Sequence, residues 1–153
     1  MNRLAKAIIL VSVFSFGSTL CHAGALGGLQ PGVRGGIYTD SDDFFLGADV
    51  KFSVLMLTAN PSVEYVFIDK GTLMTFNADA LLNVLNLPAV SGWLGGGVGL
   101  MSFKPDEGDS SSDPLFNVIA GVGFGVLFNP YVTAKWIFAD KNDGFVVAVG
   151  VRF

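Results

Sequence analysis

Cysteine and histidine are almost absent from this sequence, which has one of each, Cys21 and His22. Both lie in a leader-like stretch at the start, so we expect the mature chain to contain neither. A chain without cysteine has no disulfide framework. A chain without histidine lacks the base that serine or cysteine nucleophiles use. These absences argue against nucleophile–base catalysis, and we predict that the protein is not an enzyme.

Residues 1–23 are typical of a secretory signal peptide. They have a basic start, an apolar run from Ala7 to Phe16, and small residues after it. We predict cleavage after residue 23, or as late as residue 25, which leaves one domain over residues 24–153. An N-terminal membrane anchor fits less well, because the apolar run is short and serine interrupts it.

Charge is also scarce. Asp, Glu, Lys and Arg make up 14% of the residues, against about 25% in an ordinary soluble domain. Hydrophobic residues make up 51%, and the mean hydropathy is +0.57. Yet no internal run reaches the roughly 18 apolar residues of a membrane helix, because Gly, Asn, Asp or Lys interrupts each candidate. Lipid permits only one other spanning structure, the closed β-barrel.

What the sequence does contain is a repeated alternation of period two. The last ten residues put Phe145, Val147, Val149, Val151 and Phe153 on one face and mostly small residues on the other. Seven earlier segments alternate similarly, and turn signals separate them. We predict an all-β fold, an eight-stranded antiparallel up-and-down transmembrane barrel. The predicted strands cover residues 32–39, 44–54, 61–68, 72–82, 93–103, 115–128, 131–138 and 144–153.

The charged residues of these segments fall on the face opposite the bulky one. We predict that they form an ion-paired network inside the barrel, made of Arg34, Asp49, Lys51, Glu64, Asp79, Lys135 and Arg152. In a soluble, lipocalin-like barrel these charges would point outwards. Exposing the bulky face to water would cost roughly 1.5–3 kcal/mol at each position, whereas lipid leaves only a nearly balanced set of charges to pair. We therefore favour the membrane orientation, with a lumen that side chains plug.

The acidic residues outside the strands gather in alternate turns. If the chain starts in the periplasm, the turns that face outside hold Asp40, Asp42, Asp43, Asp69, Asp106, Glu107, Asp109, Asp113, Asp140 and Asp143. The turns predicted on the other side, at residues 57–60, 83–91 and 129–130, hold no acid. Aromatic residues near strand ends predict two interfacial girdles. The outer girdle would contain Phe44, Phe67, Phe103, Phe138 and Phe145, and the inner one Trp93, Phe128, Tyr131 and Phe153.

Three stretches carry a family resemblance: Asn77–Leu82 leading through Pro88 to Trp93–Gly99, the glycine-alternating Ala120–Gly125, and the closing Val149–Phe153. Together they resemble the small eight-stranded outer-membrane β-barrels of the OmpA, OmpX and opacity-protein type. The resemblance implies a bacterial outer-membrane location and contact with outer-membrane lipid and lipopolysaccharide. It also implies that the C-terminal strand is the signal for the barrel-assembly machinery, through Phe145, Val147, Val149, Val151 and Phe153.

These features predict a non-enzymatic integral outer-membrane protein. We expect a structural role in envelope integrity or a role in surface contact, a monomer, and no nucleic-acid partner. Two alternatives stay open: a narrow channel for small solutes, and a soluble ligand-binding barrel in the periplasm. Bilayer conductance separates the first alternative from a plugged barrel, and membrane fractionation separates the second.

No cofactor or metal site is expected. Gly95-Gly96-Gly97 is not followed by the Gly-Lys-Ser/Thr of a phosphate-binding loop. A carboxylate site built from Asp49, Glu64 and Asp79 is less favoured than ion pairing, because charges in the lumen need partners. The acidic turns could hold Ca²⁺ or Mg²⁺, but they lack the Asp-x-Asp-x-Asp-Gly loop, so solvated loops are favoured.

Overall fold

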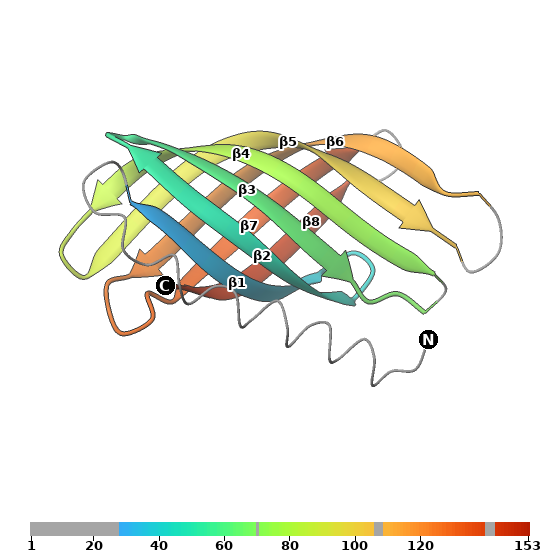
Figure 1. The fold of residues 1–153 in the computed structure, drawn as a ribbon, viewed down its shortest axis with the longest axis horizontal. Helices are drawn as coiled ribbons and strands as arrows, with labels where there is room; N and C mark the ends of the chain where they lie inside the picture. The colour runs from blue at the N-terminus through green and yellow to red at the C-terminus, as the bar shows by residue number, and fades with distance from the viewer. Residues whose placement is uncertain (1–27, 70, 106–108, 140–142) are drawn as a thin grey trace.

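Eight antiparallel strands close into a barrel in a computed structural model that describes residues 28–69, 71–105, 109–139 and 143–153. Each strand pairs with its neighbours in the chain, and pairing between the first and last strands closes the sheet (Figure 1). The strands are β1 (Leu29–Tyr38), β2 (Asp43–Val54), β3 (Leu57–Val66), β4 (Thr72–Asn86), β5 (Val90–Lys104), β6 (Ser111–Phe124), β7 (Tyr131–Ala139) and β8 (Gly144–Arg152). The predicted eight-stranded up-and-down barrel is confirmed. The predicted signal peptide lies outside the described residues.

The turn predicted at residues 57–60 is wrong. β3 begins at Leu57, which pairs with Val54, so Leu55 and Met56 alone form the turn. Leu55 has a φ of 57°, in the left-handed region that bulky residues rarely adopt. The sequence signal was missing because two apolar residues make this turn in place of the usual glycine or asparagine.

Other predicted boundaries also shift. β4 and β5 continue into the predicted connection 83–91 and leave only residues 87–89 between them. β6 covers Ser111–Phe124, four residues earlier than the start and end predicted for it. Phe128 and Asn129 adopt φ values of 66° and 38°, which no strand tolerates, so this segment turns the chain.

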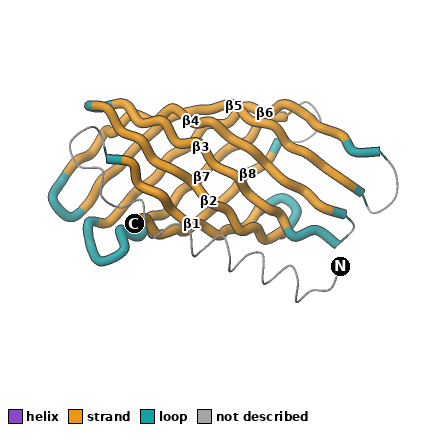
Figure 2. Tube along the Cα trace, viewed as in Figure 1, coloured by secondary structure: helices purple, strands orange, loops and turns teal. Residues whose placement is uncertain are grey.

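The two ends of the barrel differ in composition. We call the end that holds the start of β1, the end of β8 and the turns 55–56, 87–89 and 125–130 the terminal end (left in Figure 2). Its turns carry exposed apolar side chains, with Leu55 95% and Leu127 80% exposed. The opposite end, which we call the acidic end, holds the other connections, and the described acids Asp40, Asp42, Asp43, Asp69, Asp109, Asp113 and Asp143 lie in or next to them.

The outer face of the barrel is apolar and exposed. Along β6, Phe116, Val118, Val122 and Phe124 are all exposed, and on β5 Leu94, Val98 and Leu100 are too. In total 29 large hydrophobic side chains of the described residues are exposed, far more than a water-soluble surface of this size carries without strong association. None of the described residues forms a helix long and apolar enough to cross a membrane.

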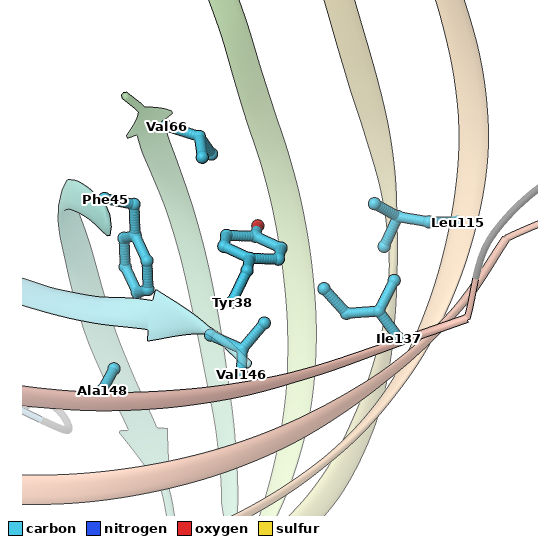
Figure 3. Close-up of a cluster of buried hydrophobic side chains, with 7 residues drawn as sticks. All are labelled: Tyr38, Phe45, Val66, Leu115, Ile137, Val146 and Ala148. Atoms are coloured by element: carbon cyan, nitrogen blue, oxygen red, sulfur yellow. The ribbon is translucent and has the colours of Figure 1, made fainter. Parts of the chain in front are cut away.

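Apolar side chains also fill the lumen near the acidic end. Tyr38 and Phe45 pack edge to face with ring centroids 5.7 Å apart. They belong to a buried cluster, which we call the apolar plug, with Val66, Leu115, Ile137, Val146 and Ala148 (Figure 3). Six of the eight strands contribute to it. The lumen is therefore closed here by packed side chains, as expected for a barrel of eight strands.

Candidate functional site

The charged side chains in the middle of the strands point into the lumen. Those of Arg34, Asp49, Glu64, Asp79, Lys135 and Arg152 are buried, and that of Lys51 is half-buried. The structure brings the seven predicted residues together in two groups. One lies in the middle of the barrel around Glu64, and the other lies nearer the terminal end around Asp49.

Glu64 is the acceptor on which the central group converges. Its Oε1 lies 2.5 Å from Arg34 Nη2 and 3.8 Å from Lys135 Nζ. Its Oε2 accepts hydrogen bonds from the hydroxyls of Thr75 at 2.7 Å and Tyr38 at 3.1 Å. Both Glu64 oxygens are thus partnered, as a buried carboxylate requires.

Asp79 completes this central group. Its Oδ2 lies 3.6 Å from Lys135 Nζ, and its Oδ1 accepts a hydrogen bond of 2.9 Å from the Asn117 amide. Two cations, Arg34 and Lys135, therefore face two anions, Glu64 and Asp79, and the group is neutral overall. Such balance is what keeps charges tolerable in a lumen without bulk water.

The second group is organised by Asp49. Its Oδ2 pairs with Arg152 Nη2 at 2.8 Å, and its Oδ1 accepts a 2.5 Å hydrogen bond from the Tyr131 hydroxyl. The Arg152 guanidinium also lies 3.7 Å from the centre of the Tyr131 ring. This geometry combines an ion pair with a cation–π contact.

Glycines on the middle strand allow these pairs to form across two strands. Arg34 and Glu64 both pair in register with Gly47, which lies between them. Gly32 stands between Asp49 and Arg152 in the same way. Strands two apart are about 10 Å from each other, so their long side chains meet only over a position without a side chain. An added Cβ at Gly32 would lie 2.8 Å from Asp49 Oδ1.

Lys51 is the exception among the predicted network residues. Its ammonium lies 4.9 Å from the centre of the Trp93 ring, and it forms no ion pair within the described part of the chain. The Arg152 guanidinium lies 5.4 Å from the same ring. Two cations therefore share one indole, and only Arg152 has a carboxylate partner.

The prediction that Trp93 and Tyr131 belong to an interfacial girdle is wrong. Trp93 is 2% and Tyr131 1% exposed, and both pack in a buried cluster with Leu81 and Ile119. Trp93 alternates in step with the inward-facing Gly95 and Gly97, so its period-two position, rather than its place at a strand end, decides its direction. Added Cβ atoms at Gly121 and Gly123 would meet the Trp93 ring, so these glycines leave room for it.

A pocket of about 170 Å³ opens beside this cluster at the terminal end of the lumen. Its lining includes Lys51, Trp93, Tyr131 and Arg152. Gln30, Phe124 and Asn129 lie exposed at its rim. The ion-paired layer and the apolar plug fill the lumen beyond it, so the pocket is blind.

The residues of the expected assembly signal lie on or next to β8. Phe145, Val147 and Val151 are half-buried, and Val149 is 60% exposed. Phe145 packs against Trp136 of β7, with ring centroids 4.8 Å apart, and the terminal Phe153 packs against Phe128 at 6.4 Å. The recognition role of this strand stays a prediction.

The described acids of the acidic end form no cation site. Asp40 Oδ2 accepts a hydrogen bond from the Phe145 amide at 2.6 Å, so this acid caps a connection. Within the described ranges, no three acidic, cysteine or histidine residues converge as metal ligands would. Asp106, Glu107 and Asp140, which belong to the acidic turns predicted from sequence, lie outside the described residues.

Sequence reasoning missed the apolar plug, although the signal was present. Tyr38, Phe45, Val66, Ile137 and Val146 all occupy the face that carries the charges. The charged positions on the same face indicate a polar lumen and give no sign that its acidic end is apolar. The lumen is layered, with the plug at the acidic end, ion pairs in the middle, and an aromatic and cationic pocket at the terminal end.

Comparison with solved structures finds the same architecture. The N-terminal β-barrel domain of Pseudomonas aeruginosa OprF superposes with a TM-score of 0.68 at 12% identity, over 84% of this chain and 98% of that one. Neisserial surface protein A, NspA, gives 0.60 at 16%, over 86% and 100%. The chain has the fold of a small outer-membrane β-barrel. The de novo designed protein TMB2.3 shares this fold, with a TM-score of 0.54 at 13% identity over 85% and 97%.

Sequence comparisons give no closer relative of this small outer-membrane-type barrel. No family model matches the chain, and no curated protein matches it either. At identities of this size the likeness establishes the fold alone. The evidence for its function therefore lies in its own surfaces and lumen.

Proposed function

We propose that this protein is a non-enzymatic integral protein of the bacterial outer membrane, in which a plugged barrel has a structural or surface-contact role. The observation that carries the proposal is the polarity of the barrel wall. Exposed Phe, Val and Leu side chains cover the outside, whereas six of the seven charged residues of the predicted network are buried inside. A solvated barrel would have the opposite arrangement, and hydrocarbon is the medium that this surface matches.

The proposed orientation places the acidic end at the outer surface and the terminal end in the periplasm. Acids that flank an apolar belt keep that end in water, next to lipopolysaccharide head groups. The acyl chains of outer-membrane lipid would contact the exposed residues of the strands. We propose a monomer, because pairing of β1 with β8 already closes the barrel and leaves no open sheet edge.

Membrane fractionation tests this proposal directly. Cells that express the protein are broken, and the membranes are washed with alkaline carbonate. We expect the protein to stay in the pellet, to need detergent for extraction, and to migrate faster on gels before boiling than after it. Recovery of folded protein in the detergent-free supernatant would support the soluble periplasmic barrel and refute the membrane role.

The channel alternative has less support, because both the apolar plug and the central ion pairs obstruct the lumen. Purified protein in planar bilayers should give no steady ohmic current. A steady current that scales with the amount of inserted protein would contradict the plugged barrel and favour a conduit.

We also propose that β8 and Phe153 carry the signal for the barrel-assembly machinery. The exposed residues Val149 and Phe153 support this, since they remain available on the outer face. Deletion of Phe153 tests this role, through its effect on assembly of the barrel in cells.

A further inference from the structure

The blind pocket at the terminal end contains more positive than negative charge. Lys51 and Arg152 are its two cations. Among the described residues, Asp49 pairs with Arg152 and no acid pairs with Lys51. Both oxygens of Asp49 are already occupied, one by Arg152 and one by the Tyr131 hydroxyl. The local sum is one positive charge, carried by Lys51.

Further donors around the pocket also lack acceptors. The buried Arg152 Nε and Trp93 Nε1 have no hydrogen-bond partner within the part of the chain that the structure describes. Lys51 Nζ faces the Trp93 ring, and no described carboxylate pairs with it. Buried donors are normally satisfied, and these two lie beneath the pocket wall, while the half-buried Lys51 lines the pocket itself. The pocket therefore offers an unpaired positive charge next to a buried arginine.

We propose that the pocket formed by Lys51, Trp93, Tyr131 and Arg152 binds an oxyanion, a phosphate or carboxylate group, that enters from the terminal end. Arg and Lys are the side chains that bind such groups by charge-assisted hydrogen bonds. The cavity of about 170 Å³ admits a group of this size, since one water fills about 30 Å³ of the liquid. This site goes beyond the proposed structural role, because a plugged wall protein has no need of it.

The position of the pocket limits what the bound anion can do. Its rim residues Gln30, Phe124 and Asn129 lie at the terminal end, while the central ion pairs close its far side. The anion can therefore enter and leave from one side only. The pocket is a receptor site for a solute or for the phosphate of a lipid head group, and it is not a step in passage across the barrel.

Trp93 supplies the signal for a binding experiment. The chain has two tryptophans, and Trp136 lies on the outer face, 47% exposed. A Trp136→Phe variant, folded in a phosphate-free maltoside detergent, therefore reports from Trp93 alone. Its fluorescence is titrated with inorganic phosphate and, separately, with acetate, at constant ionic strength set by chloride. We expect a saturable change with at least one of the two anions, and the responding anion identifies the chemistry.

Lys51→Gln is the decisive substitution in the Trp136→Phe background. Because Lys51 holds no carboxylate, its neutralisation leaves no buried acid unpaired, and folding should be retained as judged by gel migration. Loss of one charge-assisted contact should weaken anion binding by about tenfold or more. Lys51→Arg should keep binding, and Lys104→Gln, which removes an exposed lysine at the acidic end, is the matched control and should bind as the parent does.

The result that overturns the proposal is a folded Trp136→Phe protein whose fluorescence shows no saturable response to either anion. Equal affinity in the Lys51→Gln variant would overturn it as well. Transfer of the protein to phosphatidylglycerol vesicles then separates the two sources of the group. A head group in the pocket would abolish the response to added phosphate, whereas a free solute site would keep it. Since folding is measured separately by gel migration, failure of this site is distinct from failure of the membrane role.

Discussion

Glu64→Gln is the substitution that should most weaken the barrel. Glutamine keeps the shape of the side chain but removes the negative charge that faces Arg34 at 2.5 Å and Lys135 at 3.8 Å. It also replaces one acceptor oxygen by an amide that donates. The central group would then hold two cations against Asp79 alone. Breaking a buried pair by removing one partner costs about 3–5 kcal/mol, and burial of Glu64 leaves no water to screen the loss.

Urea unfolding of the protein in lipid vesicles measures this cost, with tryptophan fluorescence and gel migration as independent readouts. We expect the free energy of unfolding to fall by the amount above. Asp109→Asn, an exposed acid at the acidic end, is the control and should change it by less than about 0.5 kcal/mol. The double variant Arg34→Met, Glu64→Leu should recover much of the loss, because it leaves Lys135 facing Asp79 as a balanced pair. A Glu64→Gln protein as stable as the parent would refute the central role of this ion-paired group.

Three further predictions test other parts of the barrel. Gly47→Ala should destabilise the barrel by about 1–3 kcal/mol in the same unfolding assay, because the new Cβ would lie 2.6 Å from the Val63 carbonyl oxygen and 3.0 Å from Glu64 Cγ. Gly28→Ala is the matched control, because its new Cβ would meet nothing within 4 Å. Equal effects of the two substitutions would contradict the crowding argument. Val98→Arg, on the exposed outer face, should lower stability in vesicles by about 2–4 kcal/mol, whereas unchanged stability in vesicles would mean that this face does not contact hydrocarbon. Deletion of Phe153 should slow the appearance of the gel-shifted form in cells yet leave folding of purified protein in detergent intact, and normal assembly in cells would argue against the C-terminal signal.

The sequence alone was sufficient for the number of strands and for the two faces of each strand. Alternation has a period of two residues, so the direction of a side chain follows from counting along the strand. This is why Asp49, Glu64 and Lys135 could be assigned to the same face before any coordinates were considered. The same alternation places Trp93 and Tyr131 on the lumen face, and it is a better guide to their direction than their position near strand ends.

The pairing of charges could not be predicted in this way. Which lumen residues meet depends on the tilt and stagger of the strands, which are properties of the closed barrel. Arg34 reaches Glu64 over Gly47, two strands away, and the sequence shows no local sign of that contact. Turns without glycine or asparagine, such as Leu55-Met56, were hidden for a different reason, since their residues look like the strands that flank them.

The contrast between the two ends of the barrel bears on the direction in which the chain enters a bilayer. Apolar hairpins such as Leu55-Met56 and Val126–Phe128 can pass through hydrocarbon at little cost, whereas each acidic carboxylate that crosses must be desolvated or protonated. Unassisted insertion into preformed vesicles should therefore be led by the hairpins of the terminal end, and the carboxylates should stay on the side from which the chain arrived. If the chain arrives from the periplasm and displays those carboxylates on the far side, as proposed above, it needs a catalyst that moves them across the bilayer. In the proposed orientation, the topology in the cell would therefore be imposed by the assembly machinery and would be opposite to the one that the chain adopts by itself.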